Sequence, residues 1–216
     1  MISSYTDLQT AIIEYAGRDT DSVFIARVPT YIQLFEAKCN RDLFTRQMEQ
    51  RSTSTIDILQ AEPEFLALPS DFQSMRRIRL SSVQGKPFLQ FKSGSQMDEF
   101  RMQADDVAGQ PLYFTIFGSE IELGPTPDQD YTVEMIYRQN LPALASNSTN
   151  WLLSLAPDAY LYGSLMEASA AIDNQSRLQV FALGLKTAMD DLNALGMVSA
   201  FNAGPMTVRP AGVNVW

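Results

Sequence analysis

The chain has 216 residues, of which 45% are hydrophobic, and 25 acidic against 16 basic side chains give a net charge of −9 at pH 7. This length suits one domain with a core of its own, and the acidic balance argues against nucleic-acid binding through broad neutralisation of phosphates. The sequence contains no histidine, which excludes Ser-His-Asp and Cys-His catalysis and histidine-containing zinc sites.

Neither membrane insertion nor a disulfide framework is expected. No run approaches the roughly 18 apolar residues that a membrane helix needs, and the start of the sequence lacks the basic and apolar stretches of a secretory signal. The single cysteine, Cys39, lies among apolar residues at helical spacing, which favours a buried small side chain over a nucleophile. A lone cysteine also fits synthesis in a reducing cytosol.

Two helical patterns open the chain. Residues 7–16 carry apolar side chains on one face, with a capping-box pattern at Thr6 and a terminating glycine at Gly17. Residues 23–26 then predict a short turn, and a proline at the first helical position predicts a longer helix over roughly 29–45. The charged side chains of this second helix are expected on its surface: Glu36, Lys38, Arg41 and Asp42.

The apolar period changes to 2 in the central region, which predicts strands over about 51–140. Residues 75–80 place apolar and basic side chains on opposite faces, and a strand over 131–138 alternates an aromatic-rich face with a polar one. A two-residue turn at Gly118-Ser119 would pair the flanking strands as a hairpin. That register places four apolar side chains on one face, as a buried hairpin requires: Phe114, Ile116, Ile121 and Leu123.

Helical periodicity returns after Trp151. Residues 157–172 and 175–195 each carry an apolar stripe, and the short connector Asp173-Asn174 predicts that the two helices pack as an antiparallel hairpin. Together the patterns predict an α+β fold: a helical body from the N- and C-terminal helices, a central antiparallel β-rich region and an extended C-terminal arm. We expect residues 1–196 to form a single domain that precedes the arm.

The expected arm, residues 197–216, is apolar without a helical period, contains two prolines and two glycines, and has Arg209 as its one charged side chain. Such a segment is too apolar for an ordinary solvated tail. We expect it to dock on a neighbouring copy, on another protein or on the chain's own body, and a disordered terminus is the alternative. The candidate partner-binding residues are Phe201, Pro205, Met206, Val208, Arg209, Pro210, Val213, Val215 and Trp216.

No catalytic, cofactor-binding or metal-binding constellation is predicted. Nucleotide-binding glycine motifs and the hydrolase motif Gly-x-Ser-x-Gly do not occur. The basic run Arg76-Arg77-Ile78-Arg79 is a candidate for phosphate contact, although pairing with acidic side chains of the protein is favoured. Solvated carboxylates, rather than a converging catalytic cleft, are expected for four acidic pairs: Asp105-Asp106, Asp128 with Asp130, Asp190-Asp191, and Glu120 with Glu122.

Several short motifs follow one another over roughly residues 5–195. In order they are Tyr5-Thr-Asp-Leu8, Pro29 to Leu43, Arg46-Gln-Met-Glu49, Leu68-Pro-Ser-Asp-Phe72, Leu141-Pro-Ala-Leu144, Thr149-Asn-Trp-Leu-Leu153 and Pro157 to Leu165. Each consists mostly of core and turn residues, but the ordered set is more specific than any one motif. This set resembles the head-to-tail adaptor proteins of tailed bacteriophages.

The resemblance implies a structural protein of the virion neck, made in the bacterial cytoplasm, with no cofactor and no enzymatic activity. It implies a dodecameric ring of neighbouring copies between the portal protein and a tail or nozzle protein, with the C-terminal arm reaching along the portal. Genomic DNA would pass through this ring without sequence-specific binding, and an acidic chain suits such a conduit because a basic wall would retain phosphates. Two alternative functions are a tail-associated cell-wall hydrolase and a tail module that binds the host surface.

Overall fold

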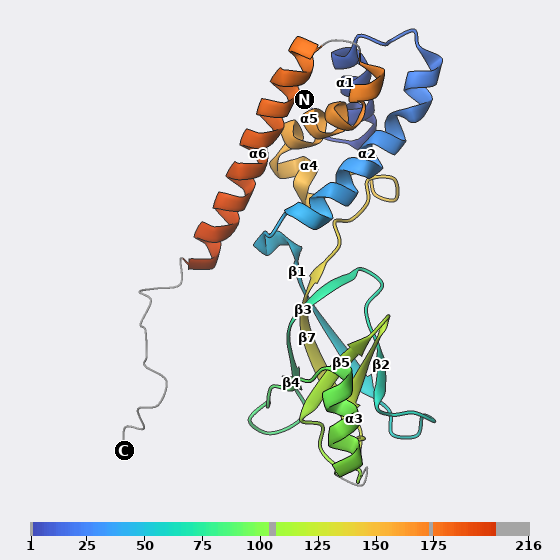
Figure 1. Ribbon diagram of the computed structural model, residues 1–216, viewed down its shortest axis with the longest axis vertical. Helices are drawn as coiled ribbons and strands as arrows, with labels where there is room; N and C mark the ends of the chain where they lie inside the picture. The colour runs from blue at the N-terminus through green and yellow to red at the C-terminus, as the bar shows by residue number, and fades with distance from the viewer. Residues whose placement is uncertain (1, 104–106, 173–174, 202–216) are drawn as a thin grey trace. The chain divides into compact units, whose positions relative to one another are not determined.

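The computed structural model describes residues 2–103, 107–172 and 175–201, and the chain forms two compact units (Figure 1). One unit contains the residues up to Gln47 and those from Leu141 onward, and the other is Met48–Asn140. The first is helical, whereas the second is built mainly from two β-sheets. The predicted α+β class is therefore confirmed, while the single domain with an arm stays a prediction.

The described part of the helical unit contains the α-helices α1 (Tyr5–Ala16), α2 (Ser22–Asp42), α4 (Trp151–Leu155), α5 (Pro157–Glu167) and α6 (Gln175–Phe201). Helix α1 ends as predicted at Gly17, which adopts the left-handed conformation with φ 66° that glycine tolerates best. Its N-cap is Ser4, whose hydroxyl accepts a hydrogen bond from the backbone N–H of Asp7, so the predicted cap at Thr6 is wrong. Thr6 already lies in the first turn of the helix.

Helix α2 begins earlier than predicted and passes through Pro29. The Asp21 carboxylate accepts hydrogen bonds from the backbone N–H groups of Val23 and Phe24, which starts a helix where the sequence suggested a turn. A proline inside a helix removes one backbone hydrogen bond. Burial of a continuous apolar face compensates for this loss, and the face consists of Phe24, Val28, Ile32, Phe35 and Cys39.

Helices α5 and α6 run antiparallel, as predicted. Asp158 at the start of α5 lines a small cavity with Leu195 late in α6, whereas the ring of Tyr162 stacks on Phe181 early in α6. The expected helix over 157–172 is shorter, because a 3-10 turn at Ser169–Ala171 follows α5 and tightens its end. Helix α6 continues to Phe201, beyond the predicted start of the arm. Residues 173–174 and 202–216 lie outside the described residues.

The second unit consists of two sheets with a shared core. Its strands are β1 (Glu49–Ile56), β2 (Phe65–Ala67), β3 (Phe72–Leu80), β4 (Gln90–Phe91), β5 (Tyr113–Phe117), β6 (Glu120–Gly124) and β7 (Tyr131–Gln139). One sheet has the antiparallel order β1-β7-β3. The other has the order β2-β6-β5-β4, in which β4 runs parallel to β5. Side chains from both sheets form one buried cluster that includes Ile78, Ile121, Val133 and Met135.

The predicted hairpin is confirmed residue by residue. Strands β5 and β6 pair Ile116 with Ile121 and Phe114 with Leu123, and the turn residue Gly118 has the positive φ of 56° that its position requires. The register is fixed because a shift by one residue would turn the apolar face away from the core.

Helix α3 (Gly94–Gln103) covers the other face of this hairpin. Arg101 holds it there by donating from Nε to Glu122 Oε1 at 2.7 Å, from Nη1 to Thr126 Oγ1 at 3.0 Å and from Nη2 to the Leu123 carbonyl at 3.0 Å. Glu122 is buried as a result. The expectation that Glu120 and Glu122 would both lie on an exposed face is therefore wrong for Glu122.

Candidate interaction surface

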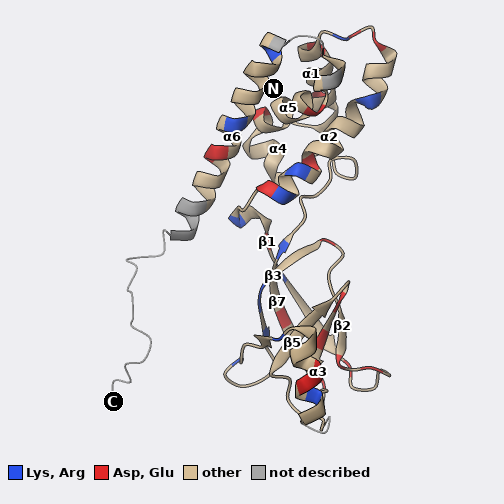
Figure 2. Cartoon of the chain, in the orientation of Figure 1, with Lys and Arg blue, Asp and Glu red and all other residues tan. Residues whose placement is uncertain are grey.

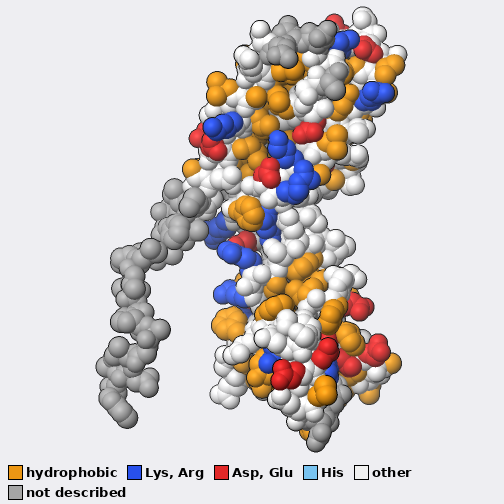
Figure 3. Space-filling model, in the orientation of Figure 1, with side chains coloured by type: hydrophobic (Ala, Val, Ile, Leu, Met, Phe, Trp, Pro, Cys, Tyr) orange, Lys and Arg blue, Asp and Glu red, His pale blue; other side chains and the backbone are white. Residues whose placement is uncertain are grey.

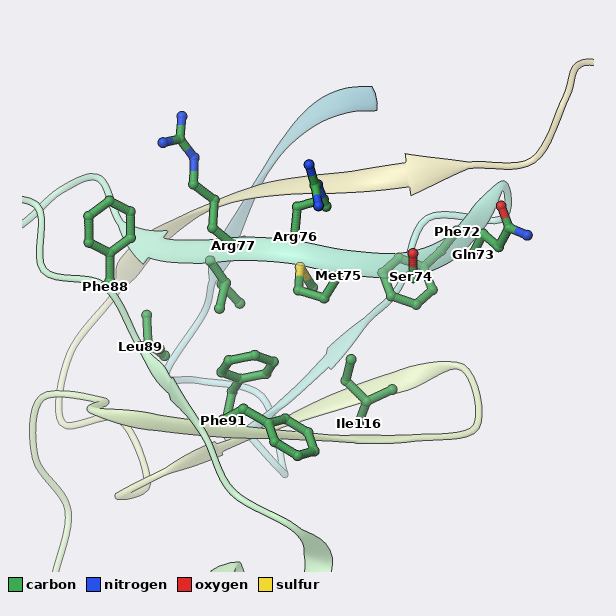
Figure 4. A pocket seen from close by; sticks show the side chains of 12 residues that line it. Phe72, Gln73, Ser74, Met75, Arg76, Arg77, Phe88, Leu89, Phe91 and Ile116 are labelled. Carbon is green, nitrogen blue, oxygen red and sulfur yellow. The ribbon is translucent and has the colours of Figure 1, made fainter. Parts of the chain in front are cut away.

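A groove of about 680 Å³ lies between the edge of β3 and the strands β4 and β5 (Figure 4). All its lining residues belong to the β-sheet unit. Apolar residues of both sheets line it: Phe72, Met75, Ile78, Phe91, Phe114 and Ile116. The volume and the apolar lining are those of a site that binds a ligand or a peptide segment.

Two irregularities in β3 give the groove its apolar lining. In the pairing with β7, Met75 lies opposite Tyr137 and Ile78 opposite Met135, and the register shifts by one residue between Phe72 and Ser74 and again between Met75 and Arg77. Each additional residue reverses the facing of the part of the strand before it. Without the irregularity at Arg76, this arginine would face the core in place of Met75. A prediction from strict alternation of inward and outward side chains does not reveal this extra residue.

The segment that crosses from one sheet to the other closes one end of the groove. The backbone N–H of Leu80 donates to the Pro87 carbonyl at 3.0 Å, and that of Leu89 donates to the Ile78 carbonyl at 3.1 Å, before β4 pairs with β5. The rings of Phe88 and Phe91 remain 57% and 63% exposed at the rim. Apolar side chains gather over this unit beside a row of basic ones (Figure 3).

The first part of β3, 72–77, has an open edge. In the described ranges of the chain, no strand pairs with it on the side away from β7. An open edge presents backbone N–H and C=O groups that can pair with another chain. The groove therefore combines an apolar floor with a strand edge available for pairing.

Basic residues follow one another along β3 (Figure 2), and most of them have acidic partners within the same unit. Arg76 Nε donates to Glu49 Oε1 at 3.0 Å. Glu134 lies on the central strand β7, is 3% exposed, and pairs through its two carboxylate oxygens with Arg51 and Arg79, each at 2.6 Å. The favoured interpretation of this run, pairing with acidic side chains of the protein, is confirmed for Arg76 and Arg79.

Carboxylates neutralise most of the positive charge along β3. The hydrogen bond from Arg51, with a further one from Arg79, holds the pKa of Glu134 below its usual value. Arg77 places its guanidinium 6.0 Å from the centre of the Phe88 ring, within the range of a cation–π contact. Arginines held in this way are less suited to capture of free phosphate.

The helical unit contains a buried carboxylate that the sequence did not reveal. Glu36 was expected on the surface, but it is 5% exposed. Its Oε1 accepts from the backbone N–H of Leu144 at 2.8 Å and from the Tyr160 hydroxyl at 3.1 Å. Asn150 Nδ2 in turn donates to the Tyr160 oxygen at 2.6 Å. Burial raises the pKa of Glu36, and the network joins α2 to the segment before α4 rather than lining a cleft.

The four acidic pairs do not converge in the described residues. Asp128 accepts from the Tyr131 hydroxyl at 2.7 Å, and Asp130 accepts from the backbone N–H of Ile58 at 3.0 Å. Both Asp190 and Asp191 are exposed on α6, and Asp105 and Asp106 lie outside the described residues. Among the described residues, no group of three or more Asp, Glu, Cys or His side chains is placed to hold a metal ion. No described helix is both long and apolar enough to span a membrane.

The candidate partner-binding residues of the arm are not tested by the structure. Phe201 is the last residue of α6, and the other eight lie outside the described residues: Pro205, Met206, Val208, Arg209, Pro210, Val213, Val215 and Trp216. The groove itself was not predicted. Three of its apolar residues, Phe72, Met75 and Ile78, are spaced by three in the sequence. The two irregularities of β3 place them all along the groove, although this spacing does not match the period of 2 expected for a strand.

Comparison with known protein families finds one whose model, described as SU10 adaptor protein, matches residues 3–209. This match spans both compact units and most of the chain. No curated protein matches the sequence.

Proposed function

The chain belongs to the SU10 adaptor protein family, and from this premise we propose that it is a structural protein that joins the portal to the tail in the neck of a tailed phage. The match over residues 3–209 is the observation that carries the proposal. Copies of the protein form a closed ring, dodecameric by resemblance to adaptors of this kind. The ring extends the DNA channel and presents the site to which the tail or nozzle protein attaches.

Two features of the chain support this role. An adaptor has to contact different proteins at its two ends, and the chain provides two compact units with separate cores. The net charge of −9 also suits a conduit from which DNA must leave without being retained. The basic residues Arg51, Arg76 and Arg79 are paired with carboxylates, so they add little to phosphate binding.

The C-terminal arm supplies a contact that forms on assembly. Its apolar residues lose conformational entropy on docking, and the buried apolar surface compensates for that loss only when a partner is present. Residues from Phe201 to Trp216 therefore bind the portal or a neighbouring copy. Free subunits stay apart until the portal gathers them, which prevents rings from closing in the wrong place.

Attachment of tails to heads tests the proposal. Heads filled with DNA in the absence of this protein should carry no tails, and purified protein should restore tail attachment and infectivity when it is added to heads and free tails. Full tail attachment in the absence of the protein would contradict the adaptor function.

A zymogram tests the alternative of a cell-wall hydrolase. The adaptor proposal predicts no clearing zone in a gel that contains peptidoglycan. A zone that persists in the purified protein and disappears on substitution of one acidic pair, such as Asp128 and Asp130, would favour the enzyme instead.

A further inference from the structure

We propose that the groove of the β-sheet unit receives residues 202–216 of a neighbouring copy, part of which adds as a strand along the open edge of β3. This inference rests on the ring proposed above. The groove of one copy is then filled by the C-terminal residues of a neighbouring copy, and these residues have a defined binding site.

The groove has both features that strand addition needs. The edge of 72–77 offers backbone hydrogen bonds, and the apolar floor offers places for alternate side chains of the added strand. Met75 of β3 points toward Ile116 of the other sheet, and Phe91 lies on the same side of the groove as Ile116 (Figure 4). The crossing at 87–89 occupies the far end of β3, so the open part of the edge ends where pairing within the unit begins.

The sequence of 202–216 matches this site. Met206 and Val208 alternate with Thr207 and Arg209, and Val213 and Val215 flank a polar residue in a second short run. Such a period of 2 places apolar side chains on one face of an extended segment. Prolines at 205 and 210 limit each run to the short length that an edge of this size can pair. Fifteen extended residues reach about 50 Å, which exceeds the length of the open edge.

Charge selects this occupant over an acidic peptide. The segment has one charged side chain, Arg209, and the groove floor has none, so docking buries no unpaired charge. The two arginines of β3 nearest the groove point away from its floor (Figure 4). The charge of Arg76 is already paired with Glu49, and the Arg77 guanidinium lies 6.0 Å from the centre of the Phe88 ring rather than over the groove floor (Figure 4).

A closed ring favours the neighbour's segment over the chain's own. When each copy donates its segment to the next and receives one from the previous copy, every groove is filled and the contact closes with the ring. A segment that docked in the groove of its own chain would also fill that groove, but it would not hold two copies together.

Disulfide trapping between two different variants tests the proposal. The acceptor carries Met75→Cys and ends at residue 201, so it has a groove but no segment to donate. The donor is a full chain with Val208→Cys. The native Cys39 does not interfere, because it is fully buried and burial raises the pKa of its thiol to about 12. We expect an intermolecular disulfide between positions 75 and 208 when the variants are mixed and assembled on portal rings.

Three comparisons make the result decisive. Adding Phe91→Glu to the acceptor should abolish the disulfide, because it places a carboxylate at the exposed rim of the apolar floor. A control acceptor with Leu59→Cys, a more exposed position on the loop after β1, should give none, although its thiol is easier to reach than one at position 75. In a full chain carrying Met75→Cys and Val208→Cys, a disulfide formed within one chain and never between chains would overturn the proposal.

The failure of this inference differs from the failure of the adaptor function. Variants that bind portal rings but form no disulfide between positions 75 and 208 would overturn the groove assignment and leave the adaptor role intact. Variants and wild type that ignore portal rings would contradict the adaptor role, and the disulfide yield between free copies at high concentration would then decide the groove assignment.

Discussion

Tyr160 joins two parts of the helical unit through a single hydroxyl group. This group donates to Glu36 and accepts from Asn150, and all three side chains are buried. The substitution Tyr160→Phe should lower the free energy of unfolding by about 1–3 kcal/mol, because two buried polar groups lose a partner. Chemical denaturation measures this change. Tyr162→Phe, which leaves the stacking of that ring on Phe181 in place, is the control, and an equal loss for both variants would contradict the account.

Gly163 lies on α5 where no side chain fits. A Cβ built there would come within 2.1 Å of the buried Phe35 ring. Helix propensity alone predicts that Gly163→Ala stabilises the protein by about 1 kcal/mol, whereas the steric conflict predicts a net loss of about 1–3 kcal/mol. Thermal or chemical unfolding decides between the two signs. Gly109→Ala, whose Cβ would lie 3.4 Å from Pro125, should change the stability little.

Glu134 predicts a dependence of stability on pH. Its two arginine partners lower the pKa of the folded state, so the carboxylate stabilises the fold above the pKa of the unfolded chain, about 4.3. This contribution is lost as the pH falls through the lower, folded value. The stability advantage of wild type over Glu134→Gln should be constant from about pH 6 to 7 and should shrink below about pH 4.3. Denaturant titrations across this range measure it, and a gap that does not change with pH would contradict the assignment.

At the scale of single elements, the start of α2 depends on one cap. Asp21→Ala should cost about 0.5–2 kcal/mol, because the N–H groups of Val23 and Phe24 lose their acceptor. The exposed Asp19 nearby provides a matched control, since Asp19→Ala removes the same charge from the region before the helix. Comparable losses in the two variants, measured by denaturant unfolding, would show that charge rather than capping matters here.

The sequence predicts an element well where local pattern and packing agree. The β5–β6 hairpin follows from period-2 alternation around Gly118, because one register alone buries the apolar face. Pro29 predicts too late a start for α2, because the cap at Asp21 and the buried apolar face outweigh the hydrogen bond that the proline removes. Glu36 was missed for a similar reason: its partners, Leu144 and Tyr160, lie more than a hundred residues away.

The groove could not be predicted from the periodicity of the sequence. It depends on two irregularities in β3 and on the crossing at 87–89, which pairs with both sheets in turn. Each of these is fixed by tertiary pairing rather than by the local pattern. The basic run of β3 was interpreted correctly because a strand alternates its faces, and acidic partners were available on β1 and β7.

At the scale of the whole molecule, two compact units and an apolar terminal segment suit a protein that acts by assembly. The family match covers both units, and the described acidic side chains are paired or solvated rather than gathered in a cleft. Function in such a protein depends on the surfaces it presents to partners. The shape of the proposed ring and its proposed contacts with the portal are therefore the properties to test first.

Electron microscopy of the purified protein mixed with portal rings of its phage tests the adaptor function most directly. The account predicts a closed ring of copies on one end of the portal, coaxial with its channel. Portal rings that stay bare at saturating protein concentration, or that bind scattered single copies away from the channel axis, would contradict it.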